Sequence, residues 1–178
     1  MKRICIFGFI IFLAFMMNAR VNAAVTDSTQ IGFSVKHEKN SIIDPMSLFN
    51  VFSKDIGQWW DPDHTWSGKS ENLYIQSYIG GCFGEQMESG RAVKHMDVIF
   101  IDPGKMLRME GSLGPLQQFA VQGIMTMELT RKGDSTHVSL KYTVGGYIPG
   151  GAAKFAAAVD QVIGNQFTRF IRFAEGKK

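Results

Sequence analysis

The first apolar segment of the chain is short, and positive charge precedes it. Lys2 and Arg3 stand before an apolar run of 14 residues, Ile4–Met17, and small or polar residues follow up to Ala23. A membrane-spanning helix needs roughly 20 apolar residues, so this run is too short to be one. The pattern predicts a secretory signal peptide over residues 1–23, cleaved after Ala23. We therefore expect an exported protein, periplasmic or secreted.

The next apolar positions alternate and then change to helical spacing. Residues 31–36 alternate apolar and polar side chains, as in a half-buried strand. Asp44 and Pro45 follow as a helix start, because Asp caps free backbone N–H groups and Pro is tolerated in the first turn. Apolar residues recur at helical spacing up to Gly57, where we expect this helix to end.

From residue 72 the pattern is that of strands joined by tight turns. Alternation runs over 72–87, and we interpret Gly80 and Gly81 as a bulge inside one curved strand. Further strands are predicted over 91–101, 105–110, 119–130 and 136–147. Each pair is separated by residues typical of turns or loops. Such hairpin-linked strands form an antiparallel sheet.

A long helix is predicted from Ala152 to Ala174, with one broad apolar stripe and an alanine-rich first half. No other predicted element is long enough to cover one face of the sheet. We therefore predict an α+β fold in which a curved antiparallel sheet of about six strands wraps around the C-terminal helix. One or two short helices follow the first strand, and the domain covers residues 27–175. Small side chains between helix and sheet predict an internal cavity.

Net charge changes this picture little once the leader is set aside. The chain has 178 residues, 19 Lys and Arg against 16 Asp and Glu, a formal charge of +3. Three of the basic residues lie in the leader, which holds no acid, so the mature chain has 16 of each sign and a formal charge of zero. This balance gives no electrostatic basis for binding nucleic acid.

Several short motifs occur in an order that resembles a known superfamily. They are Trp59-Trp60-x-Pro62-x-His64-Thr65-Trp66-Ser67-Gly68, Gly80-Gly81-Cys82-Phe83-Gly84-Glu85, His95-x-x-Val98, Pro103-Gly104-x-x-Leu107-Arg108, Gly111-x-Leu113-Gly114-Pro115-Leu116-Gln117, Gly123 and Tyr142-x-Val144-x-Gly146-Tyr147. Together they span about residues 30–172 and resemble the START-like (SRPBCC) superfamily with its helix-grip fold. The most similar branch is that related to the activator of the ninety-kilodalton heat-shock chaperone ATPase.

The resemblance implies a hydrophobic ligand cavity but no particular reaction, because this fold hosts carriers, cyclases, hydroxylase subunits and co-chaperones. Export argues against a cytosolic chaperone partner. We expect a non-catalytic monomer that binds a small hydrophobic or amphipathic ligand, with no cofactor and no transmembrane segment in the mature chain. The residues predicted for the cavity are Trp66, Tyr78, Cys82, Glu85, His95, Gln117, Tyr142, Tyr147, Phe155, Val159 and Ile163.

Two alternatives stay open. The first is an enzyme of cyclase, dehydratase or hydrolase type that uses Glu85 and His95 as an acid–base pair. By strand parity Glu85 faces inward if Phe83 does, and an inward carboxylate would have a pKa raised by burial. The second is a protein-interaction module that uses the Trp59, Trp60 and Trp66 corner, although we expect at least one of these indoles to be a buried plug.

The remaining candidate groups point to no further chemistry. The four histidines, His37, His64, His95 and His137, include no pair at metal-binding helical spacing, and no metal site is predicted. Only Cys82 remains after cleavage of the leader, so no internal disulfide can form, and we expect its thiol to be buried. Residues 111–117 are expected to form a loop at the cavity mouth, where Gln117 or Gln118 could hydrogen-bond the ligand.

Overall fold

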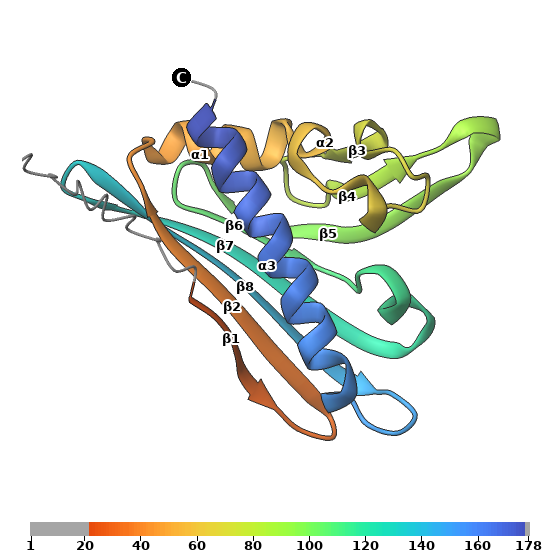
Figure 1. Ribbon diagram of the computed structural model, residues 1–178. Helices are drawn as coiled ribbons and strands as arrows, with labels where there is room; N and C mark the ends of the chain where they lie inside the picture. The colour runs from red at the N-terminus through yellow and green to blue at the C-terminus, as the bar shows by residue number, and fades with distance from the viewer. Residues whose placement is uncertain (1–21, 177–178) are drawn as a thin grey trace, which may run out of the picture.

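A computed structural model describes residues 22–176 (Figure 1). Eight antiparallel strands form one sheet in the order β1-β2-β8-β7-β6-β5-β4-β3. The strands are β1 (Asn22–Ser28), β2 (Gly32–Ser41), β3 (Leu73–Ile75), β4 (Cys82–Gln86), β5 (Ala92–Asp102), β6 (Met106–Glu110), β7 (Ala120–Lys132) and β8 (Ser135–Tyr147). The helices are α1 (Pro45–Lys54), α2 (Ile56–Trp59) and α3 (Ala153–Gly176), with 3-10 turns η1 (Pro62–His64), η2 (Ser70–Asn72), η3 (Glu88–Gly90) and η4 (Gly114–Gln118).

The predicted fold class is confirmed. The sheet curves around α3, which crosses its concave face, and the short helices α1 and α2 follow β2 at one end of α3 (Figure 1). The sheet has eight strands where about six were expected, because β1 pairs with β2 at one edge and β3 forms a separate short strand at the other. The longest strand pairings are the β7–β8 hairpin and the pairing of β8 with β2, which comes about 100 residues earlier in the chain.

The interpretation of Gly80 and Gly81 as a bulge in one long strand is wrong. Leu73–Ile75 and Cys82–Gln86 are two strands that pair antiparallel, and the glycines belong to the turn between them. Gly80 has a φ of +79°, a conformation that glycine adopts without steric cost. The turn also contacts β5, since the Gly80 N–H donates to the Val98 carbonyl.

Helix α1 begins where the sequence predicts it and ends earlier. The Asp44 side chain accepts a hydrogen bond from the Ser47 backbone N–H, and Pro45 is the first helical residue. The helix ends at Lys54, and Gly57 lies inside the next helix, α2, instead of terminating the first. The break turns the chain, so that Trp59 and Trp60 pack inward on α3 and the sheet.

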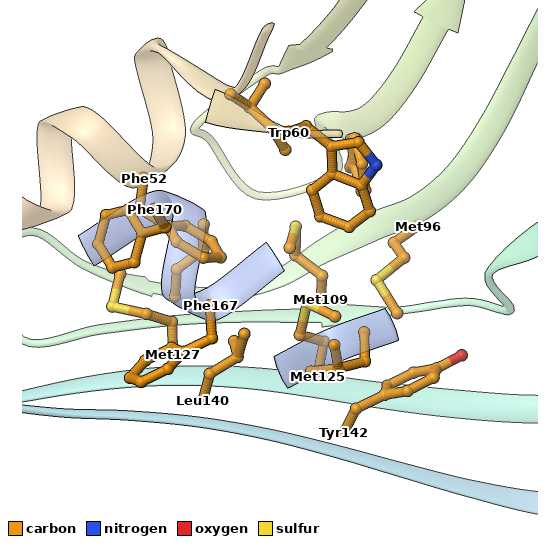
Figure 2. Packing of buried hydrophobic residues seen from close by; sticks show 14 of the residues in the cluster. Phe52, Trp60, Met96, Met109, Met125, Met127, Leu140, Tyr142, Phe167 and Phe170 are labelled. Atoms are coloured by element: carbon orange, nitrogen blue, oxygen red, sulfur yellow. The ribbon is translucent and has the colours of Figure 1, made fainter. Parts of the chain in front are cut away.

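The core fills the space between the inner face of the sheet and α3 (Figure 2). At the C-terminal end of α3, the Phe170 ring packs edge-on against Phe52 at 5.3 Å and against Trp59 at 5.4 Å. Further along the sheet, buried Met109 and Met125 supply much of the contact surface. Methionine side chains fit irregular spaces because they are unbranched and flexible.

The predicted signal peptide, residues 1–23, lies almost wholly outside the described residues, which begin at Asn22. Its cleavage therefore stays a prediction. Among residues 22–176, no helix has the length and apolar character needed to cross a membrane.

Candidate functional site

A cavity of about 480 Å³ opens between α3, the segment around η1, η4 and the inner face of the sheet. This volume lies in the range of pockets that hold one small organic ligand, about 300–1,000 Å³. Its lining is mainly apolar and aromatic. The lining residues are Trp60, Asp63, His64, Thr65, Trp66, Leu73, Phe83, His95, Leu113, Gly114, Pro115, Leu116, Tyr142, Phe155, Ala158, Val159 and Val162.

The sheet supplies an aromatic wall to this cavity. Phe83 on β4 lies between Trp60, at a centroid distance of 5.5 Å, and His95 on β5, at 4.8 Å. Tyr142 on β8 completes this side of the lining, and all four side chains are buried. On the opposite side, Phe155 and Val159 of α3 are only partly buried, which leaves the space between helix and sheet incompletely filled.

Exposed side chains surround the mouth of the cavity. Asp63, His64 and Trp66 come from the segment after α2, Pro115 from η4 and Ala158 from α3. Trp66 is 56 % exposed although it lines the cavity. Two separate loops and one helix therefore form the entrance.

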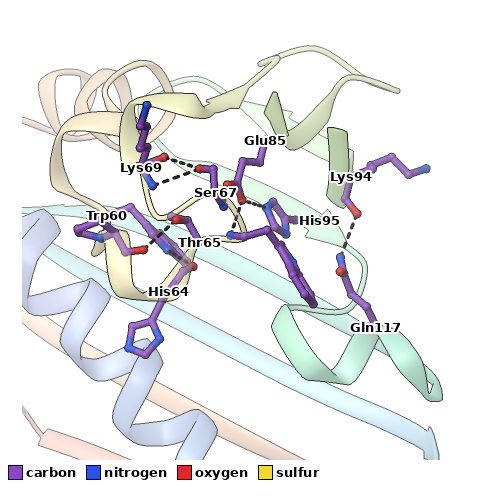
Figure 3. A network of polar contacts seen from close by, with 11 residues as sticks. Trp60, His64, Thr65, Ser67, Lys69, Glu85, Lys94, His95 and Gln117 are labelled. Carbon is purple, nitrogen blue, oxygen red and sulfur yellow. Dashed lines mark hydrogen bonds and ion pairs between the residues drawn. The ribbon is translucent and has the colours of Figure 1, made fainter. Parts of the chain in front are cut away.

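The Glu85 carboxylate binds the backbone of the first loop, the segment after α2 (Figure 3). Its carboxylate oxygens accept hydrogen bonds from the backbone N–H groups of Trp66, at 3.0 Å, and Ser67, at 2.6 Å. The Glu85 side chain is fully buried and lies beside the cavity without lining it. The inward orientation that parity with Phe83 predicts is therefore observed.

The pKa of Glu85 is lowered, opposite to the raised value expected for a buried acid. Burial by itself raises this pKa, but the hydrogen bonds from Ser67 and Trp66, together with His95 nearby, stabilise the charged form more. Glu85 is therefore a carboxylate near neutral pH. A group that stays ionised and already accepts two N–H groups is a poor proton donor.

His95 enters the cavity lining through an irregularity of β5. Phe83 pairs with Met96 and Gly84 pairs with Lys94, so His95 has no partner residue on β4 and forms a bulge. The bulge places His95 and Met96, neighbours in sequence, both in the buried interior. On the side of β5 away from β4, the His95 carbonyl faces Gly111. A Cβ atom at residue 111 would lie 2.3 Å from the His95 carbonyl oxygen, so only glycine fits there.

The His95 imidazole is buried beside the Glu85 carboxylate. Nε2 lies 3.4 Å from Oε2 of Glu85, and neither ring nitrogen has a partner in hydrogen-bond geometry among the described residues. Burial lowers the pKa of His95, and the attraction of Glu85 offsets only part of that effect. The pair therefore consists of a neutral imidazole and a carboxylate near neutral pH.

Tyr142 holds the second mouth loop. Its hydroxyl accepts from the Leu113 N–H, at 3.2 Å, and donates to the Gly111 carbonyl, at 3.3 Å. The ring lies over Gly123 of β7, where a Cβ atom would come within 2.5 Å of the hydroxyl oxygen. Burial raises the pKa of Tyr142, so the hydroxyl stays protonated. Each mouth loop is thus tied to a buried polar side chain of the sheet.

Five of the predicted cavity residues line the cavity: Trp66, His95, Tyr142, Phe155 and Val159. Residues 113–116 also line it, as expected for the mouth loop. Ile163 is buried in the core one turn further along α3, and Glu85 lies behind Trp66.

Four predicted residues lie elsewhere. Tyr78, in the β3–β4 turn, and Tyr147, at the end of β8, are 57 % and 71 % exposed. Gln117 donates through Nε2 to the Lys94 carbonyl at 3.0 Å, which joins η4 to β5 instead of reaching the cavity. Cys82 is half-buried rather than buried, because its parity on β4 is opposite to that of Phe83; Sγ lies 3.7 Å from the Tyr74 hydroxyl.

The tryptophan corner divides into a buried part and an exposed part. Trp59 donates through Nε1 to the Val51 carbonyl and is buried, as is Trp60. Trp66 alone of the three is exposed. The expected plug is therefore made by two indoles, and only the third could take part in an interaction surface.

Sequence reasoning missed six parts of the lining: Trp60, the segment 63–65, Leu73, Phe83, Ala158 and Val162. Phe83 could have been found, because its parity with Glu85 already placed it inward with that residue. Val162 belongs to the apolar stripe of α3. The segment 63–65 carried no local signal for the cavity, because the loop it belongs to is fixed through the next two residues, Trp66 and Ser67, by Glu85 some 20 residues later in the chain.

The other histidines lie outside the cavity or on its rim. His37 is buried against α3, with Nε2 3.1 Å from Oδ1 of Asp160, and His137 contacts Glu38 and Asn40 on the outer side of β2 and β8. His64 lies at the mouth of the cavity. Within residues 22–176, no three His, Cys, Asp or Glu side chains gather as a metal site would require.

Comparisons with known proteins find similar solved structures but no match to a family model or a curated sequence. Protein Mll3558 of Rhizobium loti has a TM-score of 0.60 and 17 % identity over 80 % of this chain and 96 % of that one. Ara h 8.0201 has a TM-score of 0.57 and 13 % identity over 82 % and 99 %. Protein MLL2253 of Mesorhizobium loti has a TM-score of 0.57 and 16 % identity over 82 % and 98 %.

The chain has a helix-grip fold. At these identities the likeness concerns the fold alone. The cavity lies between α3 and the sheet, where the small side chains of the sequence predicted it.

Proposed function

We propose that this protein is an exported, non-catalytic carrier that holds one small apolar or amphipathic molecule in the cavity under α3. The observation that carries the proposal is the 480 Å³ space itself, bounded mainly by apolar and aromatic side chains in the interior of the fold. A helix and sheet that only stabilised each other would fill this space with side chains, since protein interiors pack without large voids.

Among the helix-grip proteins, we propose the branch related to the activator of the ninety-kilodalton heat-shock chaperone ATPase as the relatives of this chain, on the motifs quoted above. Export by the predicted leader would separate it from any cytosolic chaperone. The proposed function is therefore ligand carriage outside the cytoplasm.

Native mass spectrometry of the protein recovered from its own host tests this function. We expect a mature chain that lacks residues 1–23 and a second species heavier by one small organic molecule, which is released on denaturation. A chain that retains residues 1–23 would contradict export. Protein that carries no such molecule and takes up no apolar compound in solution would contradict carriage.

The second candidate is an enzyme, and the observation that favours it is His95 in the cavity with a carboxylate 3.4 Å behind it. Glu85 does not reach the cavity, so the pair could act only with His95 as the base and Glu85 as its positioning residue. Turnover of a bound compound by the wild type, lost in His95→Gln with binding retained, would support this candidate over the carrier.

A further inference from the structure

The buried and half-buried polar side chains of the cavity lining are, apart from His95, occupied within the protein. Trp60 donates through Nε1 to the His64 carbonyl at 3.1 Å, and Thr65 donates through its hydroxyl to the Pro62 carbonyl at 2.8 Å. The Tyr142 hydroxyl both accepts and donates within the mouth loop. None of these groups is free to recognise a ligand without breaking a contact that shapes the cavity.

His95 is the exception among the deeply buried lining groups. The residue is only 7 % exposed, and its Nδ1 has no hydrogen-bond partner within residues 22–176. A buried polar atom without a partner is costly, typically about 1–3 kcal/mol, unless something outside the chain satisfies it. Because His95 lines the cavity, a ligand bound there is the molecule that can satisfy it.

Glu85 decides which kind of ligand group fits. Its Oε2 faces Nε2 of His95 at 3.4 Å, which favours the tautomer with the proton on Nε2 and leaves Nδ1 as an acceptor. Burial also keeps His95 neutral by lowering its pKa. The ligand must therefore offer a donor, and an O–H group is the common donor on small apolar molecules.

The same carboxylate disfavours an anionic ligand. Glu85 is buried and ionised, so a ligand carboxylate at His95 would bring a second negative charge close to it in a water-poor interior. An anion would also need His95 as a donor or a cation, which the neutral Nδ1 acceptor is not.

Resting on the proposed carrier function, we propose that the ligand is a neutral apolar molecule with a hydroxyl group that donates a hydrogen bond to Nδ1 of His95, and that carboxylate-bearing analogues are rejected. The Glu85–His95 pair thus makes an otherwise apolar site selective for neutral hydroxyl-bearing ligands over anionic ones.

Four naphthalene compounds of similar shape test this selectivity by calorimetric titration at pH 7.5: naphthalene, 1-naphthol, 1-methoxynaphthalene and 1-naphthoate. Only 1-naphthol is a neutral O–H donor. We expect it to bind roughly tenfold more tightly than naphthalene and 1-methoxynaphthalene, the equivalent of one buried hydrogen bond. We expect 1-naphthoate to bind most weakly.

His95→Phe keeps the ring and removes the acceptor, and His95→Gln retains an acceptor. We expect 1-naphthol to lose its advantage over 1-methoxynaphthalene in His95→Phe and to keep part of it in His95→Gln. Should His95→Phe fail to fold, the ranking in the wild type alone decides. Equal binding of all four compounds, or preference for 1-naphthoate, would overturn the selectivity and leave carriage intact. Binding of none of them would instead count against the proposed function.

Discussion

Glu85 shows how a buried charge can serve structure near a binding site. Its carboxylate is fully buried, yet its pKa is lowered because two backbone N–H groups and His95 favour the ionised form over the burial that opposes it. The carboxylate thereby fixes the backbone of Trp66 and Ser67, next to the cavity mouth, and orients the imidazole that lines the cavity.

Replacing Glu85 by Gln should destabilise the protein by roughly 1.5–3 kcal/mol, because the amide can accept one N–H but turns its own NH₂ group toward the other. Urea unfolding measures this loss, and hydrogen exchange should show faster exchange at the Trp66 and Ser67 amides. Glu88→Gln is the matched control: its side chain is 88 % exposed, so its unfolding free energy should change little. Equal effects of the two changes would contradict the anchoring role of Glu85.

At the scale of elements, the β7–β8 hairpin shapes the cavity through one small and one large residue. Gly123 leaves room for the Tyr142 ring, and the Tyr142 hydroxyl then fixes the loop at Gly111–Leu113. The wall and one mouth loop are therefore coupled through adjacent strands.

Gly123→Ala should cost about 1–3 kcal/mol, because the new methyl group would overlap both the Tyr142 hydroxyl and the Gly111 carbonyl at 2.5 Å. Gly145→Ala on β8 is the control, since a Cβ atom there has no neighbour closer than 3.9 Å. Thermal unfolding of the two variants compares them directly. A Gly123→Ala protein as stable as Gly145→Ala would refute the steric argument.

Most elements could be predicted from the sequence, because alternation and helical spacing are local signals. The Asp44-Pro45 helix start and the long strands before α3 followed from such signals. Less of the candidate site could be predicted from the sequence. The bulge at His95 depends on how β5 pairs with β4, and the position of Trp66 depends on Glu85. Both features depend on contacts between residues distant in sequence, which a local pattern does not predict.

At the scale of the whole molecule, three buried titratable groups tie stability to pH in the same direction. His37 and His95 have pKa values lowered from 6.5, because burial outweighs the attraction of Asp160 and Glu85. Protonation then favours the unfolded chain, so stability is fully present above pH 6.5 and falls as the pH drops from 6.5 toward the folded-state pKa values. Glu85 adds a further loss below pH 4.5, its ordinary pKa.

The unfolding free energy, measured in urea at fixed ionic strength, should therefore change little from pH 8 to about pH 7 and decrease from about pH 6.5 to pH 5. His37→Gln should reduce the slope between pH 6.5 and pH 5, whatever its effect on stability at pH 8. A free energy independent of pH across this range would contradict the neutral, buried state of both histidines.

If the space under α3 holds a ligand, a side chain that fills this space should prevent binding, and a dye titration measures that loss. Val162→Trp places an indole in the cavity lining, and Ala157→Trp adds the same side chain at an exposed position of α3. N-phenyl-1-naphthylamine, which fluoresces in apolar surroundings, should bind the wild type and Ala157→Trp at one saturable site. Its affinity should fall at least about tenfold in Val162→Trp, with the folded state retained. Unchanged dye affinity in Val162→Trp would show that the space under α3 is not the binding site.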